Sequence, residues 1–380
     1  MASEQDTPSK QDSFSGSAAH SEQVAKLIQL VRSGEEDNIQ YALLLAEELS
    51  NPAPFQQYLD GLRPLYQLAF RNSMLLLSDF VLTELFQFTH LNISNRNLAA
   101  LPESLGELRS LKELYCNINH LRALPENIGQ LHNLQYLSCN RNELQALPES
   151  LGALQNLQAL KCEGNQLRAL PESLGQLQKL RLLDCSSNQL RALPESLGQL
   201  RSLEKLDCSS NFFRLQALHV QALPELPESI GQLHQLRLLI CHNNWLQALP
   251  ESLGALQNLQ ELSCAWNLLQ ALPKSIGQLQ NLQVLKCGHN HLKALPENLG
   301  ALQNLKQLIC HANRLQALPE SIGALQNLQV LKCANNQLQA LPESLAELPH
   351  LTRLDARNNP LTHIPPALRH KPGLELLVDA

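Results

Sequence analysis

The chain has 380 residues, of which 44% are hydrophobic and only 4% are aromatic, so a large core must be mostly aliphatic. The formal net charge of −6 argues against a nucleic-acid-binding scaffold, because such proteins present basic surfaces. No run of 18 apolar residues occurs, so the sequence predicts no transmembrane helix. The first twenty residues also lack the apolar core of a standard secretory signal.

Charge and composition both change near residue 88. Residues 1–88 contain 5 Lys or Arg residues against 12 Asp or Glu residues, whereas the remainder contains 24 against 23. Leu-Pro-Glu strings begin at Leu101, and the first cysteine is Cys116. We therefore place a domain boundary at residue 88.

The N-terminal part divides into two predicted segments. Residues 1–20 are rich in Ser, Gln and Asp, which predicts disorder. In residues 21–87, apolar residues recur at helical spacing, and one helix is expected to stop at Asn51-Pro52. Two interpretations remain open for this second segment. It is either a helical cap that covers the start of the leucine-rich segment or a separate acidic docking module. The cap is favoured because the open end of a repeat array exposes core leucines.

From residue 88 onward the sequence repeats with a period of 23 residues. One asparagine per unit closes the string Leu-x-x-Leu-x-Cys-x-x-Asn. These residues are Asn119, Asn142, Asn165, Asn188, Asn211, Asn244, Asn267, Asn290, Asn313, Asn336 and Asn359. Every interval is 23 residues except that between Asn211 and Asn244, which is 33. An earlier unit with Arg96 at the asparagine position brings the array to 12 units over residues 88–373. Residues 374–380 read as a degenerate C-terminal cap strand.

This string, LxxLxxLxCxxNxL with LPESIGxL behind it, resembles the leucine-rich-repeat family. It is most similar to the 23-residue class found in plant intracellular Ras-group-related proteins and in bacterial members, and the resemblance covers about three-quarters of the chain. The resemblance implies an α/β solenoid: a horseshoe of about 12 repeats with a parallel concave sheet, short convex helical turns and, in this chain, an α-helical N-terminal cap.

The residues of each unit support this expectation independently. Apolar and polar residues alternate within LxCxxN, which is the period of a strand. The asparagine can donate and accept hydrogen bonds with neighbouring backbone where the strand ends. In Leu-Pro-Glu-Ser-Leu-Gly, proline suits the first position of a helical turn and glutamate suits its first turn. The glycine allows either close backbone packing or a left-handed exit.

All ten cysteines occupy one inward repeat position: Cys116, Cys139, Cys162, Cys185, Cys208, Cys241, Cys264, Cys287, Cys310 and Cys333. Parallel strands lie about 4.8 Å apart. A disulfide needs Cβ atoms about 3.5–4.5 Å apart, so bridging would pinch the solenoid. A metal ladder is disfavoured because no Cys-x2-Cys pair occurs. We predict buried, reduced core residues, which favour a reducing compartment and hence the cytoplasm.

The ten extra residues lie near 214–223 and read RLQALHVQAL. They echo the LQALPE string, so a slipped partial duplication is one account. The other is a protruding loop that shapes a partner site, because insertions in solenoids lie on the surface.

Outward strand positions are the expected partner-binding surface. The predicted residues are Tyr115, Tyr136, Leu238, Ile240, Trp245, Trp266, Val284, Ile309 and Val330. Exposed apolar rows are typical of binding sites, and Trp and Tyr are enriched at binding hot spots. Neutral drift in an aliphatic-rich sequence is the competing interpretation. Histidines gather in the same region, and His289 and His311 on adjacent strands are expected to approach each other without forming a metal site.

Catalytic signals are absent from the sequence. No Gly-rich phosphate-binding loop, H-E-x-x-H string or kinase string occurs. We therefore predict a non-enzymatic, cytoplasmic, monomeric scaffold without cofactor or metal that binds a protein partner. The alternative is a secreted bacterial effector, without a cleavable signal peptide, that binds a host protein.

Overall fold

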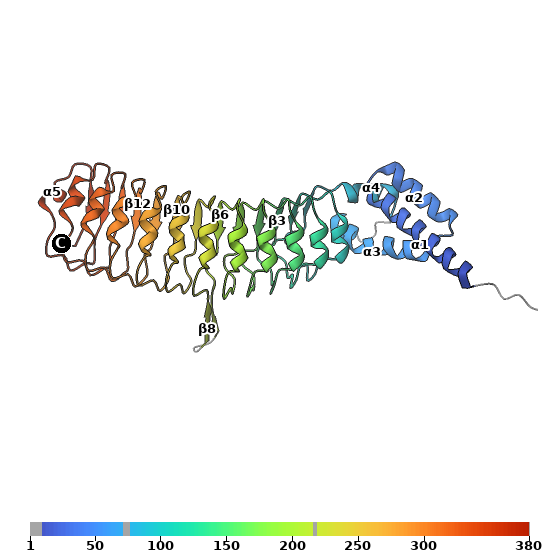
Figure 1. Ribbon diagram of the computed structural model, residues 1–380, viewed down its shortest axis with the longest axis horizontal. Coiled ribbons are helices and arrows are strands. Elements are labelled where there is room, and N and C mark those ends of the chain that lie inside the picture. Colours follow the sequence, from blue (N-terminus) through green and yellow to red (C-terminus); the bar gives the residue numbers. More distant parts are fainter. Residues whose placement is uncertain (1–9, 71–76, 216–218, 380) are drawn as a thin grey trace, which may run out of the picture.

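The repeats stack into one curved solenoid, which is seen in the computed structural model for the described residues 10–70, 77–215 and 219–379 (Figure 1). Within these residues, 13 strands form one parallel sheet. In chain order they are β1 (His90–Asn92), β2 (Glu113–Tyr115), β3 (Tyr136–Ser138), β4 (Ala159–Lys161), β5 (Leu182–Asp184), β6 (Lys205–Asp207), β9 (Leu238–Ile240), β10 (Glu261–Ser263), β11 (Val284–Lys286), β12 (Gln307–Ile309), β13 (Val330–Lys332), β14 (Arg353–Asp355) and β15 (Glu375–Leu377). The predicted solenoid with a parallel sheet is confirmed.

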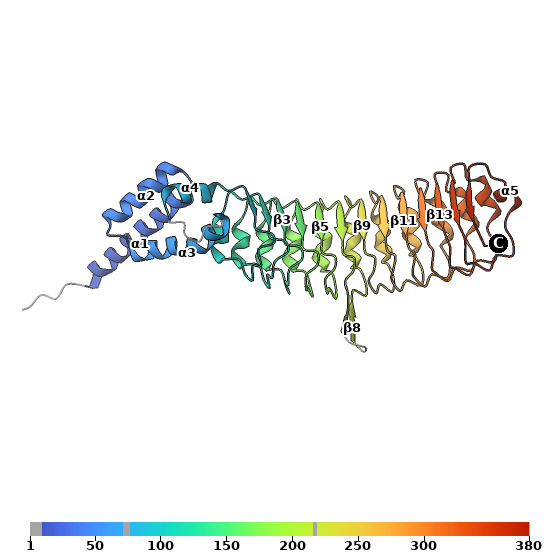
Figure 2. The same ribbon diagram turned by 180° about the vertical axis from the view of Figure 1, so that it is seen from behind.

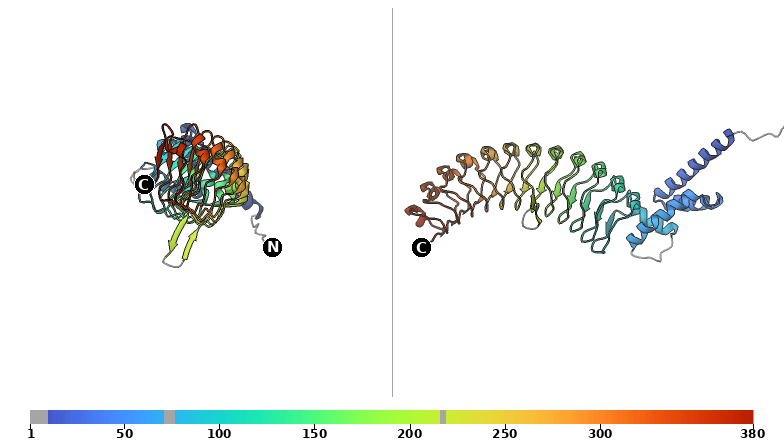
Figure 3. Two further views of the ribbon diagram at one scale, coloured as in Figure 1. Left: turned by 90° about the vertical axis from the view of Figure 1, so that its left-hand side faces the viewer. Right: turned by 90° about the horizontal axis from the view of Figure 1, so that it is seen from below.

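A short 3-10 helix covers the convex side between successive sheet strands from β1 to β14, as Figure 3 shows from below. These turns are η1 (Glu103–Glu107), η2 (Glu126–Gln130), η3 (Glu149–Ala153), η4 (Glu172–Gln176), η5 (Glu195–Gln199), η7 (Glu228–Gln232), η8 (Glu251–Ala255), η9 (Lys274–Gln278), η10 (Glu297–Ala301), η11 (Glu320–Ala324) and η12 (Glu343–Glu347). The proline precedes each turn as its cap rather than occupying its first position. Its backbone is extended there, as at Pro102 with ψ 145°.

The turn glycines are required by close packing between repeats. A Cβ atom on Gly129 would lie 2.6 Å from the carbonyl oxygen of Ser150 in the next turn. The glycines with positive φ in the described chain are Gly34, Gly164 and Gly373, and none of these lies in a convex turn. Of the two roles that the sequence left open for this glycine, close backbone approach is therefore the correct one.

An asparagine ladder ties each repeat to the one before it. The side chain of Asn188 is buried, and its Nδ2 donates to the carbonyl oxygens of Cys162 at 2.9 Å and Cys185 at 3.1 Å. Its Oδ1 accepts from the backbone N–H of Leu167 at 3.0 Å. The predicted hydrogen-bonding role of the repeated asparagine is confirmed, and it satisfies backbone groups at a bend where no strand can.

The ten cysteines carry free thiols and are fully buried. In several of them the thiol faces the next strand, and Sγ of Cys116 lies 3.4 Å from the carbonyl oxygen of Ser138. Burial raises the pKa of Cys139 and Cys264 to about 12, because a thiolate would lose its hydration. A thiol with so high a pKa is neutral near pH 7 and is a poor nucleophile.

Thiol labelling tests this arrangement. A bulky maleimide added to the native protein should label few of the ten cysteines, and labelling should rise to all ten in denaturant. The physical reason is that the reagent needs both access and a thiolate. Rapid labelling of most cysteines in the native protein would contradict the buried ladder.

Four helices form a separate layer at the N-terminal end of the solenoid (Figure 1): α1 (Lys10–Arg32), α2 (Glu36–Glu48), α3 (Ala53–Phe70) and α4 (Asp79–Gln87). The helix α1 begins at Lys10, so part of the segment 1–20 that was expected to be disordered is helical. Once a helix has formed, each added residue contributes a backbone hydrogen bond, so it extends into polar sequence. Residues 1–9 lie outside the described residues.

The helical layer is joined to the first repeat by polar contacts as well as by apolar packing. The guanidinium of Arg32 donates to the carboxylate of Glu107 at 2.6 and 2.5 Å, and Arg96 donates to the carbonyl oxygen of Leu68 in α3. Leu91 and Ile93 of the first repeat are buried. The predicted α-helical cap is thus present.

The insertion near 214–223 contains the antiparallel strands β7 (Phe212–Leu215) and β8 (His219–Ala222). This hairpin projects from one edge of the solenoid (Figures 1 and 2). The main sheet continues past it, because β6 pairs directly with β9. Residues 216–218 lie outside the described residues. At the other end of the chain, the helix α5 (Pro366–Arg369) precedes the final strand β15.

Candidate functional site

The concave face is built from two rows of side chains. They are called the first row and the third row, after the position that their residues occupy in each three-residue strand. In the sheet strands from β1 to β14 the middle residue is buried and the first and third residues lie on the concave face, although Ser138, Ser263 and Asp355 at the third position are themselves buried. The first row contains His90, Glu113, Tyr136, Ala159, Leu182, Lys205, Leu238, Glu261, Val284, Gln307, Val330, Arg353 and Glu375. The third row contains Asn92, Tyr115, Ser138, Lys161, Asp184, Asp207, Ile240, Ser263, Lys286, Ile309, Lys332, Asp355 and Leu377.

Five of the predicted aliphatic residues are half-buried members of these rows, at the C-terminal half of the sheet. They are Leu238, Val284 and Val330 in the first row and Ile240 and Ile309 in the third. The structure does not join them into a continuous strip, because polar residues such as Glu261, Lys286 and Gln307 occupy row positions between them. The surface therefore offers separate apolar contacts at intervals.

An ion pair crosses the middle of this apolar region. The Nζ atom of Lys286 lies 2.6 Å from Oε1 of Glu261, and the two side chains are 40% and 32% exposed. Glu261 separates Leu238 from Val284 in the first row. A partner seated on the aliphatic residues must therefore also cover or replace a charged pair, which favours a polar peptide or protein surface over a purely apolar ligand.

The two predicted tyrosines form a second cluster near the N-terminal end of the sheet. The rings of Tyr115 and Tyr136 have centroids 5.0 Å apart, and Nζ of Lys161 lies 5.4 Å from the centroid of Tyr136. The hydroxyl of Tyr115 donates to the carboxylate of Glu113 at 2.8 Å, which raises the pKa of Tyr115 to about 12. Four strand spacings, or roughly 19 Å, separate β3 from β9, so the tyrosines do not join the aliphatic region.

The predicted tryptophans lie where the chain leaves the strands. Trp266 is 57% exposed and occupies the left-handed backbone position before the ladder asparagine, with φ 55°. Its ring stacks on His289 with a centroid separation of 3.6 Å, and His311 meets His289 edge-on at 4.9 Å. Trp245 lies 5.7 Å from Phe212, at the base of the hairpin.

The approach of His289 and His311 that the sequence predicted is confirmed, but the stack with Trp266 was missed. Trp266 and His289 occupy equivalent positions 23 residues apart, and this spacing is the signal in the sequence that could have revealed it. Burial lowers the pKa of both histidines, so they are mainly neutral at pH 7. Within the described ranges, no group of three or more His, Cys, Asp or Glu side chains is placed to hold a metal ion.

A recess adjoins this aromatic stack at the C-terminal end of the sheet. It has a volume of about 410 Å³, and its lining includes His311, Lys332, Asp355 and Arg357. The guanidinium of Arg357 donates to the Asp355 carboxylate at 2.9 and 2.7 Å, and this contact lowers the pKa of Asp355. The recess is therefore polar, and its charged side chains are already paired with each other.

None of the described helices has the length and apolarity needed to cross a membrane.

Comparison with known proteins identifies the family. Two family descriptions match the chain, "Leucine-rich repeat region" over residues 126–214 and "Leucine rich repeat" over residues 303–361. A search of curated proteins gave no match.

Solved structures give the wider context. A leucine-rich-repeat protein of Leptospira interrogans is 33% identical with a TM-score of 0.54, and the match covers 78% of this chain and 85% of that one. The PEPR1–AtPEP1 structure is 30% identical with a TM-score of 0.66, covering 77% of this chain and 42% of that one. The functional domain of InlJ from Listeria monocytogenes, which includes a cysteine ladder, shares the fold at 23% identity and a TM-score of 0.58, covering 74% of this chain and 64% of that one. The chain belongs to the leucine-rich-repeat family.

Proposed function

We propose that the chain is a non-enzymatic scaffold that binds a protein partner on its concave face. The observation that carries the proposal is the set of half-buried aliphatic residues in the two concave rows, bordered by the exposed Trp266. Aliphatic side chains that remain partly exposed on a surface lower solubility unless a partner covers them. The PEPR1–AtPEP1 structure, which pairs a chain of the same fold with a second molecule, supports use of this scaffold for partner binding.

The spacing of the aliphatic residues suits a peptide segment or a loop. Leu238 and Ile240 share β9, Val284 lies two strands further on and Ile309 three. At about 4.8 Å per strand this region spans roughly 15 Å. Trp266 at its border supplies a residue of the type that dominates binding hot spots. We propose that Tyr115 and Tyr136 form a second contact area for a longer partner.

Two further features support a non-enzymatic, cytoplasmic protein. The ten cysteines are buried with raised pKa values, so they are unsuited to nucleophilic catalysis. Free thiols in this number are typical of a reducing compartment. Fractionation of cells and of culture medium separates this proposal from the alternative of a secreted effector.

The double substitution of Ile240→Asp and Ile309→Asp tests the concave site. Each change should weaken partner binding by well over about 1 kcal/mol, because a carboxylate replaces an apolar contact that is desolvated in the complex. Partners should be captured with the immobilised wild-type protein and identified by quantitative mass spectrometry. Their affinities for both proteins should then be measured by calorimetry.

A matched control places the same two charges on the convex side. Ala153→Asp and Ala255→Asp lie at exposed positions in η3 and η8, and they should leave binding unchanged. If the concave double variant folds normally and retains wild-type affinity, the partner does not bind at the aliphatic rows.

A further inference from the structure

We propose that the helical cap carries a second docking surface, which binds a cationic amphipathic helix of a protein partner. The described chain has six large, well-exposed hydrophobic side chains. Three of them lie on the cap, although the cap is only four helices and the rest of the chain is much longer. They are Tyr41 at 56%, Leu44 at 62% and Phe80 at 66% exposure. This surface is separate from the concave face and does not depend on the function proposed for it.

The outward side of α2 presents two of these residues together. The helix buries Ile39, Ala42 and Ala46 on its inner side. Tyr41 and Leu44 are three residues apart and fall on the opposite side, where residues at this spacing are neighbours. The helix is therefore apolar on both sides, although packing against the rest of the cap requires only one apolar side.

The helix α4 brings the third residue to the same part of the cap. Nε2 of Gln40 in α2 donates to Oδ2 of Asp79 at 3.0 Å, so the first turn of α4 lies against α2. Phe80 follows Asp79 directly and is exposed, and Glu84, one turn later, shares its outward side. Val81 and Leu85 face the core of the cap instead.

The same two helices are strongly acidic. The helices α2 and α4 contain no Lys, Arg or His, but they contain six acidic residues: Glu36, Asp37, Glu47, Glu48, Asp79 and Glu84. Such a surface repels nucleic acid, anionic lipid and a second copy of itself. It attracts a segment with apolar residues along one side and Lys or Arg beside them, which is the pattern of a basic amphipathic helix.

Among the described residues, the polar contacts between the cap and the solenoid come from α1 and α3 and not from this surface. Arg32 at the end of α1 binds Glu107 in η1, and Tyr58 of α3 donates to the same carboxylate at 3.4 Å. Leu68 of α3 accepts from Arg96 in the first repeat. Capping thus employs α1 and α3, whereas the outward sides of α2 and α4 are left for a partner.

The test uses a synthetic peptide as the probe for the unidentified partner. An 18-residue helix of Leu and Lys, with Leu at positions i, i+3, i+4 and i+7, is labelled with a fluorophore and titrated with the full chain at low salt, roughly 50 mM. We expect one-to-one binding. The double variant Leu44→Ser and Phe80→Ser should weaken it by about tenfold or more, because both side chains are buried in the complex.

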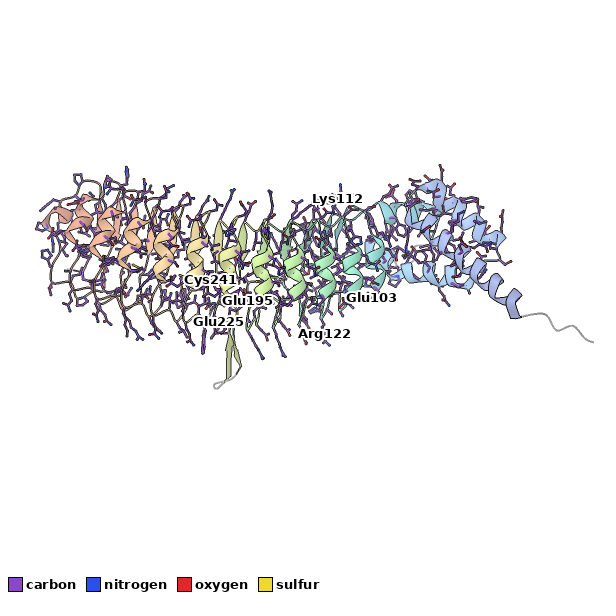
Figure 4. All side chains as sticks on the ribbon, in the orientation of Figure 1. Glu103, Lys112, Arg122, Glu195, Glu225 and Cys241 are labelled. Atoms are coloured by element: carbon purple, nitrogen blue, oxygen red, sulfur yellow. The ribbon has the colours of Figure 1, made fainter. Side chains whose placement is uncertain are left out.

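Charge variants separate the proposed site from general attraction to an acidic protein. Glu48→Lys with Glu84→Lys should also weaken binding by about tenfold. The control pair Glu172→Lys and Glu195→Lys makes the same change in net charge at exposed convex turns and should change affinity by less than about twofold (Figure 4 labels Glu195). The concave variant Ile240→Asp and Ile309→Asp should bind the peptide as the wild type does, whatever its effect on the concave partner.

Several results would overturn the proposal. They are absence of peptide binding, wild-type affinity in the Leu44 and Phe80 variant, and equal losses in the cap and convex charge variants. A dimer that forms with rising concentration and is abolished by Leu44→Ser would also overturn it, because a second copy would then cover the face. Far-UV circular dichroism checks that each variant is folded. The pair Glu48→Lys and Glu84→Lys tests the same surface independently, because both positions are exposed and their substitution does not disturb the core.

Discussion

Deletion of residues 1–87 should convert a monodisperse protein into one that aggregates or unfolds without a sharp transition. In the intact chain, Leu91, Ile93 and Leu105 of the first repeat are at least 96% buried, partly beneath the helical cap. Removing the cap exposes this end of the leucine core, and exposed ends of repeat arrays are sticky and fray. Size-exclusion chromatography with light scattering and a thermal melt measure both effects.

A milder change provides the control for this deletion. Removal of residues 1–9 leaves α1 and every described contact between cap and solenoid in place, including that of Arg32 with Glu107. That shorter truncation should elute and melt like the intact protein. A monomeric protein with unchanged Tm after loss of residues 1–87 would instead show that the helices form an independent module and do not stabilise the repeats.

Replacement of Asn188 with alanine should lower the free energy of unfolding by about 2–4 kcal/mol. The side chain is only 4% exposed and makes four hydrogen bonds to backbone, donating to the carbonyl oxygens of Cys162, Cys185 and Ser186 and accepting from the N–H of Leu167. Alanine leaves these groups buried without their partner. Because the bonds to Cys162 and Leu167 cross to the preceding repeat, the loss weakens the interface between these two repeats.

Urea denaturation followed by circular dichroism measures this change. The matched control is Gln145→Ala, which truncates an exposed side chain two repeats earlier and should alter stability by less than about 0.5 kcal/mol. Equal urea midpoints for the two variants would show that water replaces the hydrogen bonds of Asn188 without loss of stability.

Several features of this protein could be determined from the sequence alone because they recur in every repeat. The 23-residue period specified the parallel register, the inward leucines and cysteines, and the bonding role of residues such as Asn188. Each residue lies beside its equivalent one repeat further along the chain. A local pattern that is repeated many times therefore defines the contacts between repeats. The concave positions of Ile240 and Ile309 followed from the same alternation of strand residues.

Other features depended on contacts between positions that are not equivalent, and only the tertiary structure decided them. The bond from Arg32 to Glu107 joins residues 75 positions apart in segments of different composition. The outward position of Phe80 beside α2 likewise depends on how the helices of the cap pack together. No period relates such pairs, so their geometry is set by packing across the whole fold rather than by the pattern of any one segment.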